Sequence, residues 1–369
     1  MIEQKYLDIY EKTIEKVVRN SERIKATFPH VAVCENGQYS SEEPWFWTGG
    51  FWGGLLRLAY RENGSESLLM LMRELENKQD VNLDQFMKMH HDVGFLWLPT
   101  SVANYNATKD EASLTRGLKA ASILASRYNL KGHYIRAWNS NPGIKRAGFS
   151  IIDCMMNLSL LYWASKVADD PRFYHIAVSH ADTVLTNFVR PDYTVPHIVE
   201  FDPYTGKRIG TIQGQGKGPN SVWSRGQAWA IYGFAISYRE TGDTRYLEVA
   251  NKIANKYMSS LPQEGIPYYD FLADESDNWV FDSSSACITA SGLLELYRLT
   301  KDEWYYEKAL KLLDALIANY CDFSNKTEGI IMMGTVSKPN DKHINVPIIY
   351  GDYFFLEALG KLKDLEGLF

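Results

Sequence analysis

Two aspartates are the first candidates for chemistry, because each opens a predicted apolar helix and paired carboxylates can serve as general acid and general base. Asp92 lies in HHDVGF beside His90 and His91, and Asp153 lies among apolar residues in SIIDCMMN. Aspartate at a helix start usually caps the helix, but Ser150 is better placed to cap the second one. Apolar surroundings and a second carboxylate raise a carboxyl pKa, whereas the helix dipole lowers it. The sequence therefore predicts an acid–base pair and leaves the protonation state of Asp92 open.

Polar side chains in and just after the longest loop, residues 186–223, form a second group of candidates. His197 lies in TVPHIVEF, and Gln215 lies in the glycine-rich segment IQGQGKGPN. Such a segment can approach a ligand closely, but it lacks the pattern of a phosphate-binding loop. Arg225, in WSRGQAW, starts the next predicted helix. We expect its guanidinium either to form a salt bridge between helix hairpins or to clamp a substrate carboxylate through two hydrogen bonds.

Aromatic residues make up 13% of the chain and include 10 Trp and 23 Tyr. Large aromatic side chains fill cores and also form the stacking walls of sugar sites. Seven tryptophans lie near helix starts or in loops: Trp45, Trp47, Trp52, Trp97, Trp138, Trp223 and Trp229. Some of them must belong to the core, and several together suggest a sugar-stacking pocket. Because the chain shows no HExxH, facial-triad, GxSxG or kinase pattern, we expect no metal and no cofactor.

The elements that position these residues follow a repeat of helical hairpins. Six apolar helices rich in small residues are predicted at 47–62, 92–107, 150–168, 224–240, 284–299 and 350–362. Amphipathic helices follow the first five of them directly, at 63–77, 108–124, 169–185, 241–258 and 300–317, and residues 2–27 supply a sixth. Helices that are apolar on all sides are buried, so we expect the apolar set to form an inner ring that the amphipathic set covers. Strand signals are few.

Six hairpins of this kind predict an all-α fold, a closed toroid in one domain that spans residues 1–369. All inner helices then run in the same direction, so that their first residues meet at one mouth of the ring. The residues at these starts are Trp47, Asp92, Asp153, Arg225, Ser284 and Asp352. The long loops open on the same side, and long loops in compact domains are usually functional. The mouth is therefore predicted to gather two or three carboxylates, an arginine and several tryptophans.

Composition narrows the partners and the compartment. The net charge of −6, from 39 Lys+Arg against 45 Asp+Glu, argues against nucleic acid as the main partner. No apolar run approaches the roughly 20 residues of a membrane span. The first residues lack the apolar core of a signal peptide, and the four cysteines form neither a zinc pattern nor a CxxC pair. We therefore expect a cytoplasmic protein with no membrane partner, as a monomer or a weak homodimer.

The motifs match a known family. WTGGFWGGLLRLAY, HHDVGFLWLPT, SIIDCMMNLSLLYWAS, GPNSVWSRGQAWAIYGF and IYGDYFFLEAL occur in this order along the chain. With them the chain resembles glycoside hydrolase family 88, the unsaturated glucuronyl hydrolases, essentially from end to end. The resemblance implies an (α/α)6 barrel and a cytoplasmic enzyme that acts after a polysaccharide lyase. Such an enzyme removes the Δ4,5-unsaturated uronic acid from di- and oligosaccharides by hydrating its C4=C5 bond, which produces an unstable hemiketal that opens.

The resemblance also implies roles for individual residues. Asp153 matches the general acid and base, which protonates C4 and assists attack of water at C5. Asp92 matches the second essential carboxylate, which orients the ring hydroxyls. The remaining matches are pocket positions His197, Gln215, Arg225 and Trp229, the stacking residue Trp138, and the neighbours His91 and Trp47. Protonation of an enol ether develops positive charge that a nearby carboxylate stabilises, so the two-carboxylate site is chemically consistent with hydration.

A loop before the last inner helix bears on substrate preference. Family members that prefer sulfated glycosaminoglycan disaccharides carry a Ser-x-x-Ser-x-Lys loop. Ser337 and Lys342 match this pattern here, and Asn340 stands in place of the second serine. Asparagine still donates hydrogen bonds, so chondroitin, hyaluronan and heparin-type units stay open, as do sulfation and linkage.

Three other functions remain as alternatives. An unsaturated rhamnogalacturonyl hydrolase has the same ring with a different arginine-helix motif. A sugar epimerase on a similar barrel would rely on paired histidines, which HHDVGF also offers. A non-catalytic glycan-binding toroid would not need both Asp92 and Asp153.

Overall fold

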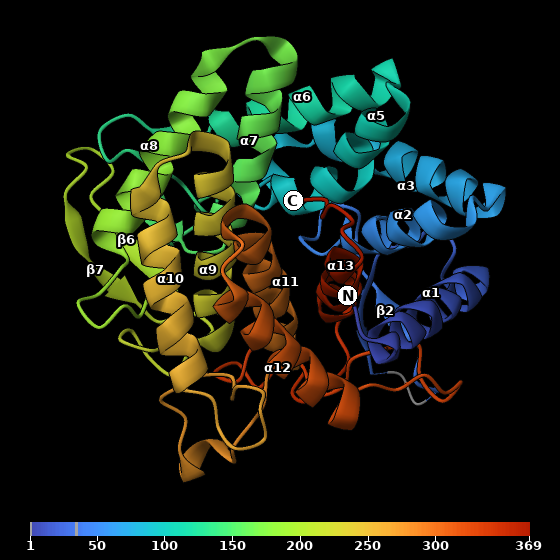
Figure 1. Cartoon of the computed structure of the whole chain (residues 1–369). Coiled ribbons are helices and arrows are strands. Elements are labelled where there is room, and N and C mark those ends of the chain that lie inside the picture. The colour runs from blue at the N-terminus through green and yellow to red at the C-terminus, as the bar shows by residue number, and fades with distance from the viewer. Residues whose placement is uncertain (1, 34–35) are drawn as a thin grey trace.

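Six helix pairs form a closed ring in the computed structural model, which describes residues 2–33 and 36–369. The inner helices are α2 (Phe51–Asn63), α4 (Val93–Trp97), α7 (Cys154–Ala168), α9 (Ser224–Thr241), α11 (Ser283–Thr300) and α13 (Ile349–Leu362). The outer helices are α1 (Gln4–Ile24), α3 (Glu66–Asp84), α6 (Glu111–Ala125), α8 (Pro171–Asn187), α10 (Thr244–Ser259) and α12 (Glu303–Asn319). Figure 1 shows the pairs following one another around the centre, so that α13 returns beside α1 and α2. The predicted (α/α)6 barrel is confirmed.

Hydrophobic patterning explains which helices lie inside. In the inner helix α9, every residue from Ser224 to Ser237 is buried. The outer helix α10 buries only one face, which carries Tyr246, Val249, Ile253 and Tyr257 at helical spacing. The expected inner ring and its amphipathic cover are therefore both present.

Four outer helices begin with a true aspartate cap. Asp110, Asp170, Asp243 and Asp302 each accept a hydrogen bond from a backbone N–H two or three residues further on. Such a cap satisfies one of the free N–H groups at the helix start. These four aspartates are the standard against which the aspartates of the inner helices are judged below.

The predicted inner helix 92–107 is not one regular α-helix. It consists of α4, a π-helical turn over Leu98–Val102 and α5 (Ala103–Thr108). Pro99 lies in the π turn and has no N–H to donate, which interrupts the regular hydrogen-bond pattern. Single π turns inside α-helices occur frequently at functional sites.

Short strands, for which the sequence showed few signals, lie in the segments that connect an outer helix to the next inner helix. They are β1 (Pro29–Ala32) with β2 (Tyr39–Ser41), β3 (Tyr128–Asn129) with β4 (Tyr134–Ile135), and the antiparallel sheet of β5 (Phe149–Ile151), β6 (Ile198–Phe201) and β7 (Arg208–Ile212). Strand β5 corrects the predicted start of the helix at 150–168, which begins at Cys154. Ser150 therefore lies in a strand and pairs with Val199 instead of capping α7.

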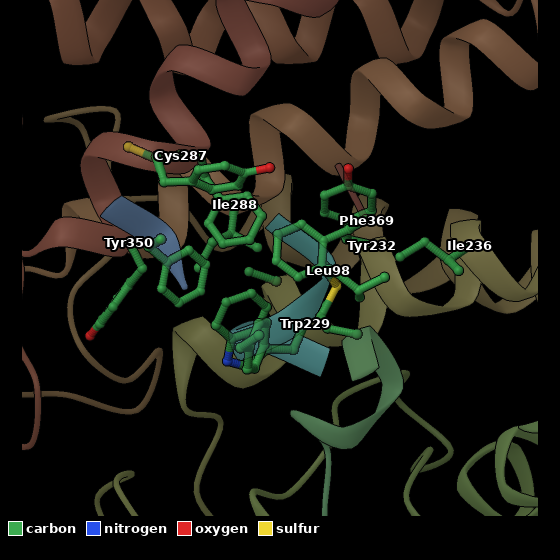
Figure 2. Close-up of a cluster of buried hydrophobic side chains, with 14 of the residues drawn as sticks. Leu98, Trp229, Tyr232, Ile236, Cys287, Ile288, Tyr350 and Phe369 are labelled. Atoms are coloured by element: carbon green, nitrogen blue, oxygen red, sulfur yellow. The ribbon is translucent and has the colours of Figure 1, made fainter. Parts of the chain in front are cut away.

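One connected cluster of buried hydrophobic side chains fills the ring and draws on all twelve inner and outer helices. Figure 2 shows its centre, where Trp229, Tyr232, Ile288 and Tyr350 gather with Phe369 from the end of the chain. Phe369 packs its ring 5.6 Å from that of Phe95 in α4. No helix among the described residues is long and apolar enough to cross a membrane.

Candidate active site

The two candidate acids open neighbouring inner helices without capping them. Asp92 precedes α4 and Asp153 precedes α7, and neither side chain accepts a hydrogen bond from its helix. Each residue is 8% exposed, so both carboxyls are largely removed from solvent. In contrast to the four aspartates of the outer helices, these two side chains are not used for capping and are left for other contacts.

Two histidines contact the Asp92 carboxylate. His90 Nδ1 lies 3.1 Å and His91 Nε2 lies 3.2 Å from Asp92 Oδ2. His90 Nδ1 also lies 3.2 Å from the backbone nitrogen of Asp92. Burial lowers the pKa of His91 well below its usual value, and the neighbouring His90 lowers it further. His91 is therefore neutral beside Asp92 at physiological pH.

Burial also shifts the pKa of Asp92, whose protonation state the sequence had left open. It raises the pKa of Asp92, and the charge of Asp153 raises it further. The hydrogen bond and the charge of His90 act in the opposite direction. Since the net shift is upward, the Asp92 carboxyl in the folded protein keeps its proton to a higher pH than a free aspartate in water does.

His90, His91 and Asp92 bring together two imidazoles and one carboxylate, with ligand atoms that all lie within 4.8 Å of one another. This is the donor set of a facial triad, which the sequence analysis had not identified although the three residues are consecutive in the chain. The expectation that the protein uses no metal stays a prediction.

His197 contacts the other candidate acid, Asp153. Its Nδ1 accepts a hydrogen bond from the backbone N–H of Gln215 at 3.0 Å, and its Nε2 lies 3.4 Å from Asp153 Oδ2. A neutral imidazole that accepts at Nδ1 carries its proton on Nε2, so we infer that His197 presents an N–H to Asp153. The loop lies so close that a Cβ on Gly214 would be 1.9 Å from His197 Nδ1, which explains a glycine at that position.

Arg225 lies at the start of α9 and is 1% exposed. It forms a salt bridge with Asp282, the residue before α11, and donates to the carbonyl oxygens of Thr335 and Val336 at 2.8 Å. It also donates to Gln215 Oε1. The expected salt bridge between hairpins is therefore confirmed, and the arginine holds the Gln215 loop through the same guanidinium. Direct contact of Arg225 with a substrate carboxylate stays a prediction.

Asp282 is a site residue that the sequence analysis missed. Its side chain is fully buried, and it accepts from Arg225, Ser284 Oγ and the backbone N–H of Thr335. The available signal was the same one that marked Asp92, an aspartate directly before an apolar helix. Ser284, which the sequence analysis placed at the start of this helix, donates a hydrogen bond to Asp282.

Asp352, the third carboxylate expected at the mouth, ties down a loop. It accepts a hydrogen bond from Tyr39 Oη at 2.6 Å and others from the backbone N–H groups of Ile330 and Ile331. Burial raises the pKa of Asp352 to about 6. These contacts account for Asp352 without a role in chemistry.

The predicted tryptophans separate into core and partly exposed residues. Trp229 is fully buried, packs 5.2 Å from Phe95 and is visible in the cluster of Figure 2. Trp47 is partly exposed and packs 4.8 Å from Tyr350, and Trp138 is partly exposed with its ring 6.1 Å from His91. Trp138 thus lies beside the site residue His91, and Trp47 lies beside Tyr350, whose ring is 5.3 Å from the Arg225 guanidinium. Trp52, Trp97 and Trp223 are fully buried, whereas Trp45 is partly exposed.

The loop at 337–342 is a tight turn closed by backbone hydrogen bonds between Ser337 and Lys342. Asn340 Nδ2 donates to Ser337 Oγ at 2.8 Å, and Lys342 is exposed. The turn directly follows Val336, whose carbonyl oxygen binds Arg225. The loop is therefore attached to the candidate site, whereas sulfate binding by its side chains stays a prediction.

Comparison with known proteins gives consistent matches over nearly the whole chain. The family model Glycosyl Hydrolase Family 88 matches residues 16–342. An unsaturated glucuronyl hydrolase from Bacillus sp. (strain GL1) is 33% identical over 94% of this chain and 93% of its own. An unsaturated chondroitin disaccharide hydrolase from Streptococcus pyogenes serotype M1 is 32% identical over 94% of this chain and 88% of its own.

Solved structures agree with these sequence matches. The crystal structure of unsaturated glucuronyl hydrolase from Bacillus sp. GL1 superposes with a TM-score of 0.92 at 32% identity and covers 97% of both chains. A substituted unsaturated glucuronyl hydrolase from Streptococcus agalactiae, complexed with dGlcA-GalNAc6S, superposes with a TM-score of 0.82 at 28% identity. That comparison covers 99% of this chain and 93% of the other.

Proposed function

The chain belongs to glycosyl hydrolase family 88, and from this membership we propose that it removes a non-reducing Δ4,5-unsaturated glucuronic acid from oligosaccharides made by a polysaccharide lyase. It is a glycoside hydrolase, as its relatives are. Glycosaminoglycan disaccharides are the substrate class, because the S. pyogenes relative is named for unsaturated chondroitin disaccharide and the S. agalactiae structure holds dGlcA-GalNAc6S.

Asp153 is the catalytic acid and base in this proposal. Its carboxylic acid donates a proton to C4 of the double bond, and positive charge develops at C5 and the ring oxygen. The resulting carboxylate then takes a proton from the water that attacks C5, so that the step adds one water across the double bond. The Nε2–H that faces Asp153 from His197 stabilises the carboxylate formed after the first transfer. The C5 hemiketal opens and releases the partner sugar.

Asp92 orients the substrate. Its raised pKa favours a neutral carboxyl that both donates and accepts hydrogen bonds, which suits contact with ring hydroxyls. Because His91 is neutral, it adds no positive charge that would repel the oxocarbenium-like charge developing on the substrate. Trp47 and Trp138 offer partly exposed faces for sugar stacking.

The observation that carries the proposal is the placement of the two aspartates. Asp92 and Asp153 open adjacent inner helices, are buried, cap nothing and each contact a histidine. Asp243 uses its carboxylate to cap α10, and Asp282, which precedes α11 without capping it, uses its carboxylate for Arg225 and Thr335. Asp153 Oδ2, in contrast, has no hydrogen-bond partner among the described residues. Two buried carboxyls at adjacent helix starts can serve as the acid and the base of a catalytic reaction.

The test follows the ultraviolet absorbance of the C4=C5 bond in lyase-generated unsaturated chondroitin disaccharides. We expect the parent protein to remove the absorbance and release the partner sugar. Asp153→Asn should lower turnover by roughly 10²–10⁴-fold while disaccharide binding persists. Asp243→Asn is the matched control, because asparagine also caps helices, and it should leave turnover unchanged.

Other outcomes redirect the assignment. Unchanged turnover in Asp153→Asn removes that residue from catalysis. Absorbance that stays flat with glucuronyl substrates rejects the proposal and makes rhamnogalacturonyl disaccharides the next substrates to test. The ratio of rates with and without 6-sulfate measures what the 337–342 loop contributes. A cytoplasmic location and a monomer or weak homodimer belong to the same proposal.

A further inference from the structure

A cavity lies at the end of the ring opposite the candidate active site. Asp92 and Asp153 open their helices, whereas this cavity of about 820 Å³ is lined by residues from the middle and the end of α2 and α7, from the ends of α9 and α11, from the π turn with α5, and from the chain end, residues 366–369. Five cationic side chains line it: Arg57, Arg61, Lys166, Arg239 and Arg298. Only two carboxylate side chains, those of Glu240 and Glu366, line it with them.

Three of the five cations have carboxylate partners. Lys166 forms a salt bridge with Glu240, and Arg239 forms a second salt bridge with the same carboxylate. Arg298 pairs with Glu366 at 3.0 Å, and Arg239 and Arg298 both contact Glu295. Basic residues in the last turn of a helix are ordinary, because they offset the negative end of its dipole. These three need no ligand to explain them.

Arg57 and Arg61 differ, since neither has a carboxylate within 4 Å among the described residues, although Arg61 also lies in the last turn of its helix. Arg57 lies a full turn before the end of α2 and is 3% exposed. It donates to Asn104 Oδ1 at 2.8 Å, and its buried Nε has no hydrogen-bond partner in the part of the chain that the structure describes. Arg61 is exposed and donates to the carbonyl oxygen of Glu366 at 2.6 Å.

The two arginines lie four residues apart and therefore on one face of α2. Burial lowers the pKa of Arg57 and the charge of Arg61 lowers it further, while the charge of Glu76 acts in the opposite direction without reversing the net shift. Glu76 therefore offsets only part of the cost of burying the Arg57 charge, and an anion in the cavity would offset more of it. Arginine forks match tetrahedral oxyanions through paired N–H donors.

We propose that the Arg57–Arg61 cavity binds a phosphate dianion, either free or carried on a monosaccharide. Neither arginine forms a salt bridge among the described residues, so both guanidinium groups are available to the two charges of a dianion. The volume leaves room for a sugar body, and Tyr60 and Trp163 line the same cavity with aromatic surface. The site is separate from the catalytic carboxyls and does not depend on the reaction they perform.

Calorimetric titration at low ionic strength tests the proposal with inorganic phosphate, glucose 6-phosphate and neutral glucose as probes. We expect at least one phosphate probe to bind and glucose not to bind. Tighter binding of glucose 6-phosphate identifies a sugar phosphate as the source, and equal affinities identify free phosphate. Added salt should weaken the binding, as expected for an ionic contact that is partly open to solvent.

Variants locate the bound probe. Arg57→Gln and Arg61→Gln should each weaken binding at least tenfold, whereas Arg73→Gln, which removes an exposed arginine from α3 outside this cavity, should not. Arg61 is exposed, so its variant keeps the test valid even where Arg57→Gln does not fold. All variants that fold should keep the parent turnover of unsaturated disaccharide.

Three results overturn the proposal: no binding of either phosphate probe, parent-like binding in Arg61→Gln, or displacement of the probe by unsaturated disaccharide in the Asp153→Asn protein. The last result would place the anion at the catalytic mouth.

Discussion

At the scale of single residues, Asp92 is a buried carboxyl that the fold holds at an electrostatic cost. Burial and Asp153 raise its pKa above the usual value of 3.8, in spite of the hydrogen bond from His90. Below that usual value the carboxyl is protonated in both the folded and the unfolded chain. As the pH rises, the unfolded chain loses its proton first, so Asp92 lowers the free energy of unfolding from there upward.

Replacing Asp92 with asparagine should therefore stabilise the protein while it impairs catalysis. We expect the free energy of unfolding at pH 7 to rise by about 1 kcal/mol, a typical size for a stabilising change at a functional residue. The gain should vanish below pH 3.8, where the carboxyl is protonated in both states. Urea unfolding at several pH values measures this. Asp110→Asn is the control with the opposite sign, since helix capping lowers the pKa of Asp110. A gain for Asp92→Asn that is independent of pH would contradict the electrostatic explanation.

At the scale of elements, the distance between the two acids depends on how closely α4 approaches α7. A Cβ on Gly94 would lie 2.5 Å from Asn157 Oδ1 and 2.8 Å from Asn157 Cα, so only glycine fits there. Asn157 Oδ1 accepts from the backbone N–H of Phe95 at 2.9 Å. The helix starts that carry Asp92 and Asp153 are thus held together by the Asn157 side chain, which packs against Gly94 and binds the backbone of Phe95.

Gly94→Ala should separate the two helix starts and reduce kcat by roughly 10²-fold, the cost of a misplacement of about 1 Å. We expect the protein to lose about 1–3 kcal/mol of stability from the overpacked contact. Steady-state kinetics and thermal unfolding test this, with Gly210→Ala as the control, because no atom lies within 4 Å of the added Cβ there. Parent kcat together with parent stability would show that the α4–α7 contact does not set the site.

The same scale shows why the sequence predicted some elements and not others. Apolar and amphipathic helices alternate as local patterns, so the ring was predictable from neighbouring residues. The sheet of β5, β6 and β7 was not, because Ile151 pairs with Ile198 far along the chain, and its apolar residues fit the adjoining helix pattern. Asp92 and Asp153 were found by their place before apolar helices. The pairing of Arg225 with Asp282 was not predicted, since Asp282 lies 57 residues away in the chain.

At the scale of the whole molecule, the Arg225–Asp282 pair joins segments from distant parts of the chain. It connects the starts of α9 and α11, the loop that carries Gln215, and the backbone at 335–336 ahead of the 337–342 turn. Both side chains are almost completely buried. Removing one partner leaves the other as an uncompensated buried charge, which typically costs 3–5 kcal/mol.

Asp282→Asn should therefore destabilise the protein by about 3 kcal/mol, whereas Asp282→Asn combined with Arg225→Met should cost clearly less than the sum of the two single changes. A double-mutant cycle in urea measures the coupling, and it should change little with added salt because the pair is buried. Activity should fall in Asp282→Asn through a higher KM as well as a lower kcat, since Arg225, which holds Gln215 and the 335–336 backbone, loses the carboxylate that fixes its guanidinium. Additive free energies would mean that Asp282 and Arg225 act independently, and the mouth would then owe its shape to the ring alone.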